Sequence, residues 1–131
     1  MSQKAIIIFV CLHGAAKSII AASYFNKIAS ETGVELHAVA RGLEPDLGLS
    51  DSVVTRLLKD GLSPTELTPQ KLLLEELETA RRVITFCELP DEYQGKAVFE
   101  YWENVPPVSE GYERARDIIV AKIKVMMKKL L

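Results

Sequence analysis

Short apolar runs alternate with amphipathic stretches along the whole chain. The first run, Ala5 to Cys11, is rich in β-branched residues, and a glycine-containing loop and a helix-forming stretch follow it. This order is typical of a strand, a loop and a helix. The same alternation recurs further along. It predicts strands at residues 4–10, 35–40, 82–86 and 97–101, and helices at residues 17–30, 51–59, 69–79 and 109–129.

Residues with special backbone preferences mark the ends of the predicted helices. Gly33 and Gly61 stand where glycine commonly ends a helix in a left-handed conformation. Ser50 is a candidate N-cap of the second helix. Thr68 and Pro69 have the order of an N-cap and a first-turn proline, so we expect the third helix to begin there.

Strands separated by helices predict a parallel sheet with right-handed crossovers and helices on both faces. We therefore expect an α/β fold: a single domain over residues 1–131, built as a three-layer αβα sandwich around a four-stranded parallel sheet. Ligands of such sheets bind at the carboxyl ends of the strands. The segments that follow the strands there are Cys11, Ala40–Arg41, Cys87 and Trp102–Glu103.

Composition narrows the class of protein. The 131 residues are 48% hydrophobic and 26% charged, which is ordinary for one globular domain. A net charge of −2 argues against nucleic acid as the main partner. Two cysteines make neither a secreted disulfide framework nor a zinc site, so we expect a reducing, cytoplasmic setting and no metal. The apolar run near the start, about eight residues, is too short for a membrane helix.

The loop after the first strand carries the strongest chemical signal. Its small residues allow backbone N–H groups to curl around a tetrahedral anion. Cys11 opens this loop, where those groups and the helix dipole favour a thiolate, the nucleophilic form. Lys17 adds a charge at the rim, and Ser18 is placed to hydrogen-bond the sulfur. The candidate anion-binding residues between them are Leu12, His13, Gly14, Ala15 and Ala16, of which His13 either touches substrate or faces solvent. The plain alternative is a buried cysteine that packs as a small hydrophobe.

The Cys-x5-Lys-Ser pattern of this loop resembles the Cys-x5-Arg-Ser loop of low-molecular-weight protein tyrosine phosphatases and of the thioredoxin-coupled arsenate reductases that share their fold. The later strand ends and the long last helix follow in the same order. The resemblance implies that Cys11 attacks the phosphorus of a phosphate ester or the arsenic of arsenate. Backbone amides from Leu12 to Ser18 would hold the oxygens, and stabilising their charge is where most of the catalysis should lie.

Two features of the loop and its neighbouring turn depart from this pattern, and a third departure lies in the segment after the fourth predicted strand. Lys17 replaces an arginine that would bind two oxygens at once, and an ammonium group cannot do so. Gly14 and Ala40 stand where the family has an asparagine and a serine that brace the loop, so we expect a less rigid loop whose shape glycine can still adopt. Arg41 either leans towards the anion in place of the missing arginine or faces solvent.

The family's general acid, an aspartate before a proline, is also absent. The matching segment reads Trp102-Glu-Asn-Val-Pro-Pro107, and Glu103 is its nearest carboxylate, with Glu110 a poorer candidate. The alternative, which the sequence favours for both glutamates, is a solvated surface residue. Loss of a general acid typically lowers a rate by about 10²–10⁴-fold, and harms ester hydrolysis most because an alkoxide leaves poorly.

Cys87 ends the third predicted strand, where the arsenate reductases keep a resolving cysteine. It is a candidate to attack the Cys11 adduct and form a Cys11–Cys87 disulfide. The reductases' further cysteine is Gln94 here, so an external thiol such as thioredoxin or glutaredoxin would have to reduce the disulfide. The alternatives for Cys87 are a buried strand residue, or a partner that protects Cys11 from over-oxidation.

Two hypotheses follow. The first is a cysteine-dependent enzyme, without a bound cofactor, that acts on a phosphate ester or on arsenate. This hypothesis leans towards the reductase branch because of Cys87 and the Trp102 segment. The second is a catalytically impaired relative that binds phosphate, another oxyanion, or a phosphorylated protein or small molecule. The three departures around Cys11 favour the second hypothesis.

Overall fold

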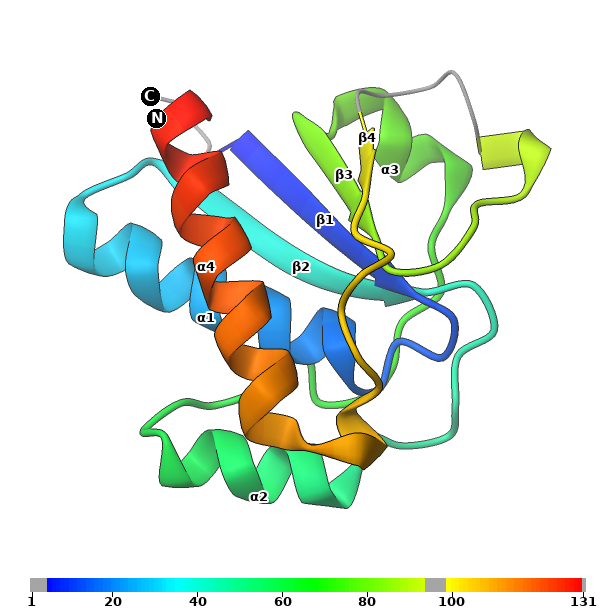
Figure 1. Ribbon diagram of the computed structural model, residues 1–131. Helices are drawn as coiled ribbons and strands as arrows, with labels where there is room; N and C mark the ends of the chain where they lie inside the picture. Colours follow the sequence, from blue (N-terminus) through cyan, green and yellow to red (C-terminus); the bar gives the residue numbers. More distant parts are fainter. Residues whose placement is uncertain (1–4, 94–98, 131) are drawn as a thin grey trace.

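The computed structural model describes residues 5–93 and 99–130 and contains one parallel sheet with the strand order β2-β1-β3-β4 (Figure 1). The strands are β1 (Ala5–Cys11), β2 (Leu36–Gly42), β3 (Arg82–Thr85) and β4 (Phe99–Tyr101). The helices are α1 (Lys17–Thr32), α2 (Asp51–Lys59), α3 (Leu74–Thr79) and α4 (Tyr112–Leu130), with short 3-10 turns at Asp91–Tyr93 and Val108–Glu110. The predicted four-stranded parallel α/β fold is confirmed.

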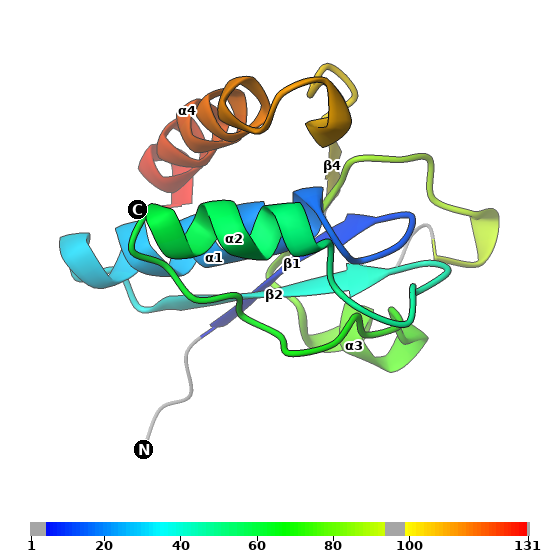
Figure 2. The same ribbon diagram turned by 90° about the horizontal axis from the view of Figure 1, so that it is seen from below.

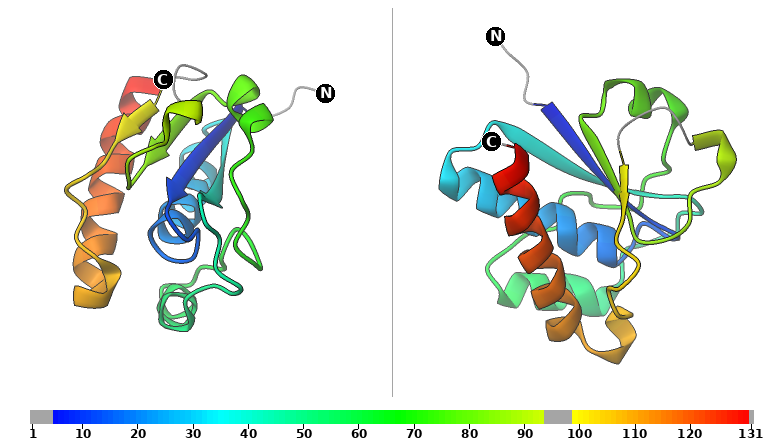
Figure 3. Two further views of the ribbon diagram at one scale, coloured as in Figure 1. Left: turned by 90° about the vertical axis from the view of Figure 1, so that its right-hand side faces the viewer. Right: turned by 45° about the horizontal axis from the view of Figure 1, so that its top comes forward.

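Two hydrophobic cores lie on opposite faces of the sheet. Ile7 and Phe9 of β1 are buried in the core shared with α1, α2 and α4, whereas Ile8 and Val10 belong to the core beneath α3. This alternation follows from the two-residue period of a strand. Figure 2 and the left view of Figure 3 show the sheet between these two groups of helices. The chain is therefore the three-layer sandwich that the sequence predicts.

The first two helices end as their glycines predict. Gly33 has φ +72°, and the N–H of the next residue, Val34, donates to the carbonyl of Ala29 at 2.9 Å. Gly61 has φ +82°, and Leu62 N–H donates to Leu57 O at 2.9 Å. Both arrangements contain the hydrogen bond between residues five positions apart that defines a Schellman motif. In this motif a residue in the left-handed conformation allows backbone N–H groups beyond the helix to donate to its last carbonyl groups.

The prediction of a helix from Pro69 is wrong for its first five residues. Gly42 N–H donates to Gln70 O at 2.8 Å, and Leu72 N–H donates to Gly42 O at 3.0 Å. This segment is therefore extended and is attached to the end of β2, and α3 begins only at Leu74. Leu72 is 1% exposed in the core beneath α3. Burying this side chain against the sheet outweighs a local helix signal, which is a weak preference.

The remaining boundaries shift by a few residues. β2 continues through Arg41 and Gly42, which the sequence placed in a loop, and α4 begins at Tyr112 because a 3-10 turn precedes it. The predicted start of the fourth strand at residue 97 and the position of Gln94 lie outside the described residues. Within the described ranges, no helix is both long and apolar enough to cross a membrane.

Candidate active site

A cavity of about 430 Å³ lies at the carboxyl ends of β1 and β3. Its walls come from the loop after β1, from residues 46–52, from the end of β3 and from residues 107–109. The loops after β1 and β2 run side by side there (Figures 1 and 3). Of the four segments that the sequence placed at this edge, the cavity takes in the Cys11 loop and Cys87, but not Ala40–Arg41 or Trp102–Glu103.

Cys11 lies at the end of β1 and lines this cavity. Its Sγ is 3.0 Å from Oγ of Ser18, a buried residue in the first turn of α1. Strand and helix thus hold the two side chains against each other, and the contact expected from the sequence is present. A hydroxyl in this position can donate a hydrogen bond to a thiolate sulfur.

Hydrogen bonds hold the loop after Cys11 through its carbonyl groups. The carbonyls of residues 11, 12, 13 and 15 accept from the N–H groups of residues 43, 44, 46 and 50, at 2.7–3.2 Å. By contrast, the N–H groups of residues 12–16 donate no hydrogen bond within the described part of the chain. The loop therefore presents a run of unbonded amide donors beside Cys11, which is the property of an anion-binding nest.

Two glycines allow this loop to lie directly on the end of β2. Gly14 has φ +62°, a left-handed conformation that glycine adopts without strain. A Cβ on Gly42 would lie 2.6 Å from the Gly14 nitrogen, so the two backbones touch. The asparagine–serine brace is replaced by this contact and by the carbonyl hydrogen bonds. That the loop is less rigid than one braced by asparagine and serine stays a prediction.

Lys17 begins α1 and lines the cavity, but its ammonium group is already hydrogen-bonded. Nζ donates to the carbonyl of Val105 at 2.9 Å. The residue before it, Ala16, provides no side-chain cap for the helix. Lys17 therefore connects the anion loop to the segment after β4, and keeps a positive charge at the cavity wall.

Arg41 does not reach the cavity, which corrects the idea that it replaces the missing arginine. Its Nε lies 2.8 Å from Oε2 of Glu76, and its Nη1 lies 3.1 Å from Oε1 of Glu66. All three side chains are at most 22% exposed, so it is not a solvent-facing arginine either. Arg41 thus neutralises the carboxylates of Glu66 and Glu76. These ion pairs attach the segment 66–76 to β2.

The carboxylate at the cavity is Asp46, rather than the predicted Glu103 or its alternative Glu110, which are exposed and do not line it. Asp46 Oδ1 lies 3.3 Å from Nδ1 of His13. The same nitrogen is 3.1 Å from the carbonyl oxygen of Glu44. The sequence analysis missed Asp46. Its position in the loop after the second strand, where ligands of parallel sheets bind, was the signal that could have found it.

Cys87 shares the cavity with Cys11, and both are free thiols. Its backbone N–H donates to Oγ1 of Thr85 at 3.2 Å, which turns the chain at the end of β3. Burial raises the pKa of the Cys87 thiol, and the charge of Cys11 acts in the same direction. A hydrogen bond from Thr85 and the charge of Lys17 oppose these effects without cancelling them. Cys87 is therefore mainly protonated at neutral pH.

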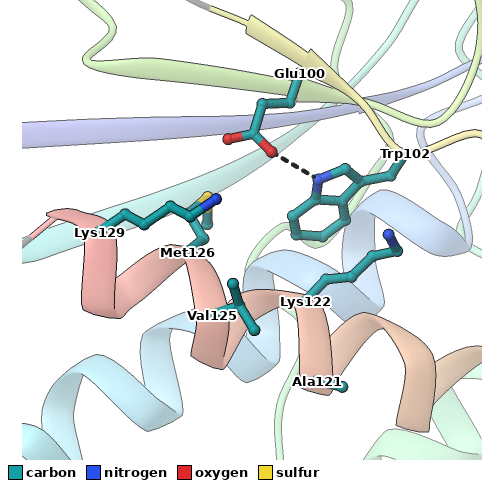
Figure 4. Close-up of a pocket in the computed structure, with 7 residues that line it drawn as sticks. All are labelled: Glu100, Trp102, Ala121, Lys122, Val125, Met126 and Lys129. Carbon is teal, nitrogen blue, oxygen red and sulfur yellow. Dashed lines mark hydrogen bonds between the residues drawn. The ribbon is translucent and has the colours of Figure 1, made fainter.

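Aromatic side chains close the inner wall of the cavity. Trp102 packs 5.8 Å from both Phe9 and Phe86, measured between ring centroids, and only Phe86 of the three lines the cavity. On its other side, Trp102 borders a second hollow of about 350 Å³ between β4 and α4 (Figure 4). There its Nε1 donates to Glu100 at 3.1 Å, and Lys122 lies over its ring. No thiol, hydroxyl or imidazole is among the described residues that line this second hollow, in contrast to the Cys11 cavity.

No protein-family model matches the sequence. Solved structures resemble it over nearly its whole length. YfkJ from Bacillus subtilis is 14% identical, with a TM-score of 0.84 over 98% of this chain and 96% of that chain. The low molecular weight protein tyrosine phosphatase from T. tengcongensis is 20% identical, with a TM-score of 0.76 over 95% and 99% of the two chains.

A thioredoxin-dependent arsenate reductase from Corynebacterium glutamicum is also similar in structure. It is 19% identical, with a TM-score of 0.70 over 98% of this chain and 62% of that chain. At sequence identities this low, the similarity shows a shared fold and does not show a shared activity. The chain has the fold that low-molecular-weight protein tyrosine phosphatases and arsenate reductases share.

Proposed function

We propose that this protein is a cysteine-dependent enzyme that acts on a tetrahedral oxyanion, with Cys11 as its nucleophile. The observation that carries the proposal is the loop after β1, whose carbonyls are bonded to residues 43–50 while its amides stay free beside the Cys11 sulfur. The sulfur attacks phosphorus or arsenic, and the bond to the leaving oxygen breaks. The free amides stabilise the negative charge that develops on the remaining oxygens.

The position of Cys87 favours arsenate as the substrate. After Cys11 has formed a thiol–arsenate adduct, the Cys87 thiolate attacks the Cys11 sulfur. The sulfur–sulfur bond forms, the sulfur–arsenic bond breaks with its electron pair on arsenic, and arsenite leaves. An external dithiol such as thioredoxin or glutaredoxin then reduces the disulfide. The presence of both thiols in one cavity and the fold shared with a thioredoxin-dependent arsenate reductase support this choice.

The raised pKa of Cys87 has a kinetic consequence for this mechanism. Only the thiolate attacks, and the burial that raises the pKa keeps most of the population protonated at neutral pH. The disulfide-forming step should therefore accelerate as the pH rises towards the pKa of Cys87. Rapid quenching of arsenate-treated protein, followed by thiol counting at several pH values, measures this step directly.

A second candidate function is oxyanion binding without turnover. The hydrogen bond from Lys17 to the Val105 carbonyl favours this second function. The ammonium group of Lys17 stands in place of the arginine of the phosphatases, and this bond already occupies one of its donors. In that case the protein would hold phosphate or a phosphorylated partner in the same cavity. Both functions use the free amides, and they differ in whether Cys11 forms a covalent bond.

The experiment that separates them compares wild type with Cys11→Ser and Cys87→Ser. Arsenate reduction with a thioredoxin or glutaredoxin system and hydrolysis of p-nitrophenyl phosphate are measured, together with thermal stability in phosphate. The enzyme proposal expects Cys11→Ser to lose both activities and Cys87→Ser to lose arsenate turnover alone. Absence of both activities in wild type, with stabilisation by phosphate, would establish the binding function instead.

Two further measurements refine the result. Lys17→Arg restores a fork of donors that can bind two oxygens, so p-nitrophenyl phosphate hydrolysis should rise if the cavity is otherwise competent. Thiol counting after one arsenate turnover without reductant should find no free thiols. Two free thiols under these conditions would remove the role of Cys87.

A further inference from the structure

The cavity contains a histidine paired with a carboxylate that the proposed mechanism has not used. His13 and Asp46 come from adjoining loops, and both line the cavity with Cys11. The backbone N–H of Asp46 donates to the carbonyl of His13 at 3.1 Å, so the two loops are joined at this point. Both side chains are 54% exposed, which leaves them in reach of a bound substrate.

The contacts of His13 determine which ring nitrogen is available. Nδ1 lies 3.1 Å from the carbonyl oxygen of Glu44 and 3.3 Å from Oδ1 of Asp46. Both partners are acceptors, so Nδ1 carries a proton and donates it. Nε2 has no hydrogen-bond partner among the described residues. The ring is therefore held with Nε2 free to exchange a proton.

We propose that His13 is the proton donor to the leaving oxygen and that Asp46 is its positioning residue. This inference rests on the proposed function and supplies the general acid that the sequence lacks in the segment after β4. His13 acts here in its imidazolium form, in which Nδ1 and Nε2 both carry a proton. As the bond from the Cys11 sulfur to phosphorus or arsenic forms and the bond to the leaving oxygen breaks, the Nε2 proton moves to that oxygen and the neutral Nδ1–H ring remains. An ester then releases a neutral alcohol, and arsenate releases water. In ester hydrolysis, Nε2 takes a proton from the water that cleaves the Cys11 adduct.

The other titratable groups at the cavity are less suited to this task. The Cys11 sulfur is the attacking atom and cannot also donate the proton. The pKa of the Cys87 thiol is raised mainly by burial, which makes it a weaker acid. Lys17 is hydrogen-bonded to the Val105 carbonyl. Asp46 itself accepts from the His13 ring, so its carboxylate orients the imidazole rather than delivering a proton.

The test varies the leaving group while keeping the oxyanion the same. Phenolate is a poorer leaving group than p-nitrophenolate, so it depends more on a proton donor. We expect His13→Gln to lower kcat/KM for phenyl phosphate by about 10²-fold and for p-nitrophenyl phosphate by less than about tenfold. The comparison uses kcat/KM because it reports formation of the Cys11 adduct, whereas kcat also includes hydrolysis of the adduct, which is the same for both esters. His37→Gln is the matched control, because His37 is the other histidine of the chain and is exposed on β2, away from the cavity.

Asp46→Asn tests the positioning role with a readout that general damage would not produce. The ¹⁵N shifts of the His13 ring report which nitrogen carries the proton, and we expect Asp46→Asn to move population away from the Nδ1–H form. Stabilisation by phosphate confirms that each variant keeps its fold and cavity.

The outcomes separate this inference from the proposed function. Equal losses on the two esters, or no loss, in His13→Gln would overturn the role of His13 and leave Cys11 chemistry standing. If esters are not turned over but arsenate is, His13→Gln should slow arsenate reduction by about 10²-fold, and an unchanged rate would overturn the inference. Absence of any Cys11-dependent turnover would overturn both.

Discussion

Replacing Gly42 by alanine tests the contact that seats the anion loop on the sheet. An added Cβ would lie 2.6 Å from Gly14 N, 2.8 Å from His13 C and 2.9 Å from Gly14 Cα. An ordinary contact begins at 3.4 Å, so the loop must move by about 0.8 Å. All three atoms belong to the backbone, and no side-chain rotation can relieve the overlap. Overpacking of this kind costs about 1–3 kcal/mol.

The assay is urea unfolding and thermal melting, each with and without phosphate. For a chain of this size, about 1 kcal/mol lowers Tm by roughly 4 °C, so Gly42→Ala should melt about 4–12 °C below wild type. Phosphate should also stabilise the variant less, because moving the loop misplaces the amides that bind the anion. Gly48→Ala is the matched control: its Cβ meets nothing within 4 Å, so its stability should stay within about 0.5 kcal/mol of wild type.

The result that would refute this reasoning is specific. If Gly42→Ala has the same Tm as Gly48→Ala and is stabilised by phosphate as much as wild type is, the loop does not depend on its contact with β2. A loss of stability with unchanged phosphate binding would show that the contact supports the fold but does not shape the anion site.

Three further predictions concern charged groups. Arg41→Met leaves two partly buried carboxylates without their cation and should lower the free energy of unfolding by about 3 kcal/mol. Arg56→Met removes an exposed ion pair and should cost less than about 1 kcal/mol, and equal losses in urea unfolding would contradict the network. Burial acts to raise the pKa of Asp60, but hydrogen bonds from two tyrosines and an arginine lower it overall, so its stabilising effect is present above the ordinary value of 3.8 and lost as the pH falls. Asp60→Asn should therefore be less stable at neutral pH and lose less stability between about pH 5 and pH 2, and an unchanged acid profile would argue against this assignment. Lys17→Met should weaken phosphate binding about tenfold in calorimetry at low salt, and an unchanged Kd would show that its charge does not act on the anion.

The elements with strong periodicity were predictable, and so was the place of the nucleophile. The run from Ala5 to Cys11 has both faces buried, so its apolar character is continuous and marks a central parallel strand. Gly33 and Gly61 end helices because few other residues adopt their positive φ at low cost. These signals act within a few residues of one another, and a single sequence therefore contains them in full.

The segment at residues 69–73 shows where local signals fail. Pro69 and the preceding Thr68 favour a helix start, but the backbone of Gly42 offers a donor and an acceptor to residues 70 and 72. Gly42 lies about thirty positions earlier in the chain, and no pattern within residues 69–73 indicates that they pair with it. The same distance separates Arg41 from its two carboxylates, so its role as a structural cation could not be inferred from the sequence.

The sequence by itself determined the parallel α/β architecture, the Cys11 loop at the end of the first strand and the second cysteine after the third, because these follow from periodicity and chain order. Tertiary structure alone decided which side chains meet at the cavity. It turned Arg41 away from the anion loop, left Glu103 in solvent and placed Asp46 beside His13. The physical reason is that each of these placements depends on residues from different parts of the chain, and the distances between them depend on how the whole sheet brings its strand ends together.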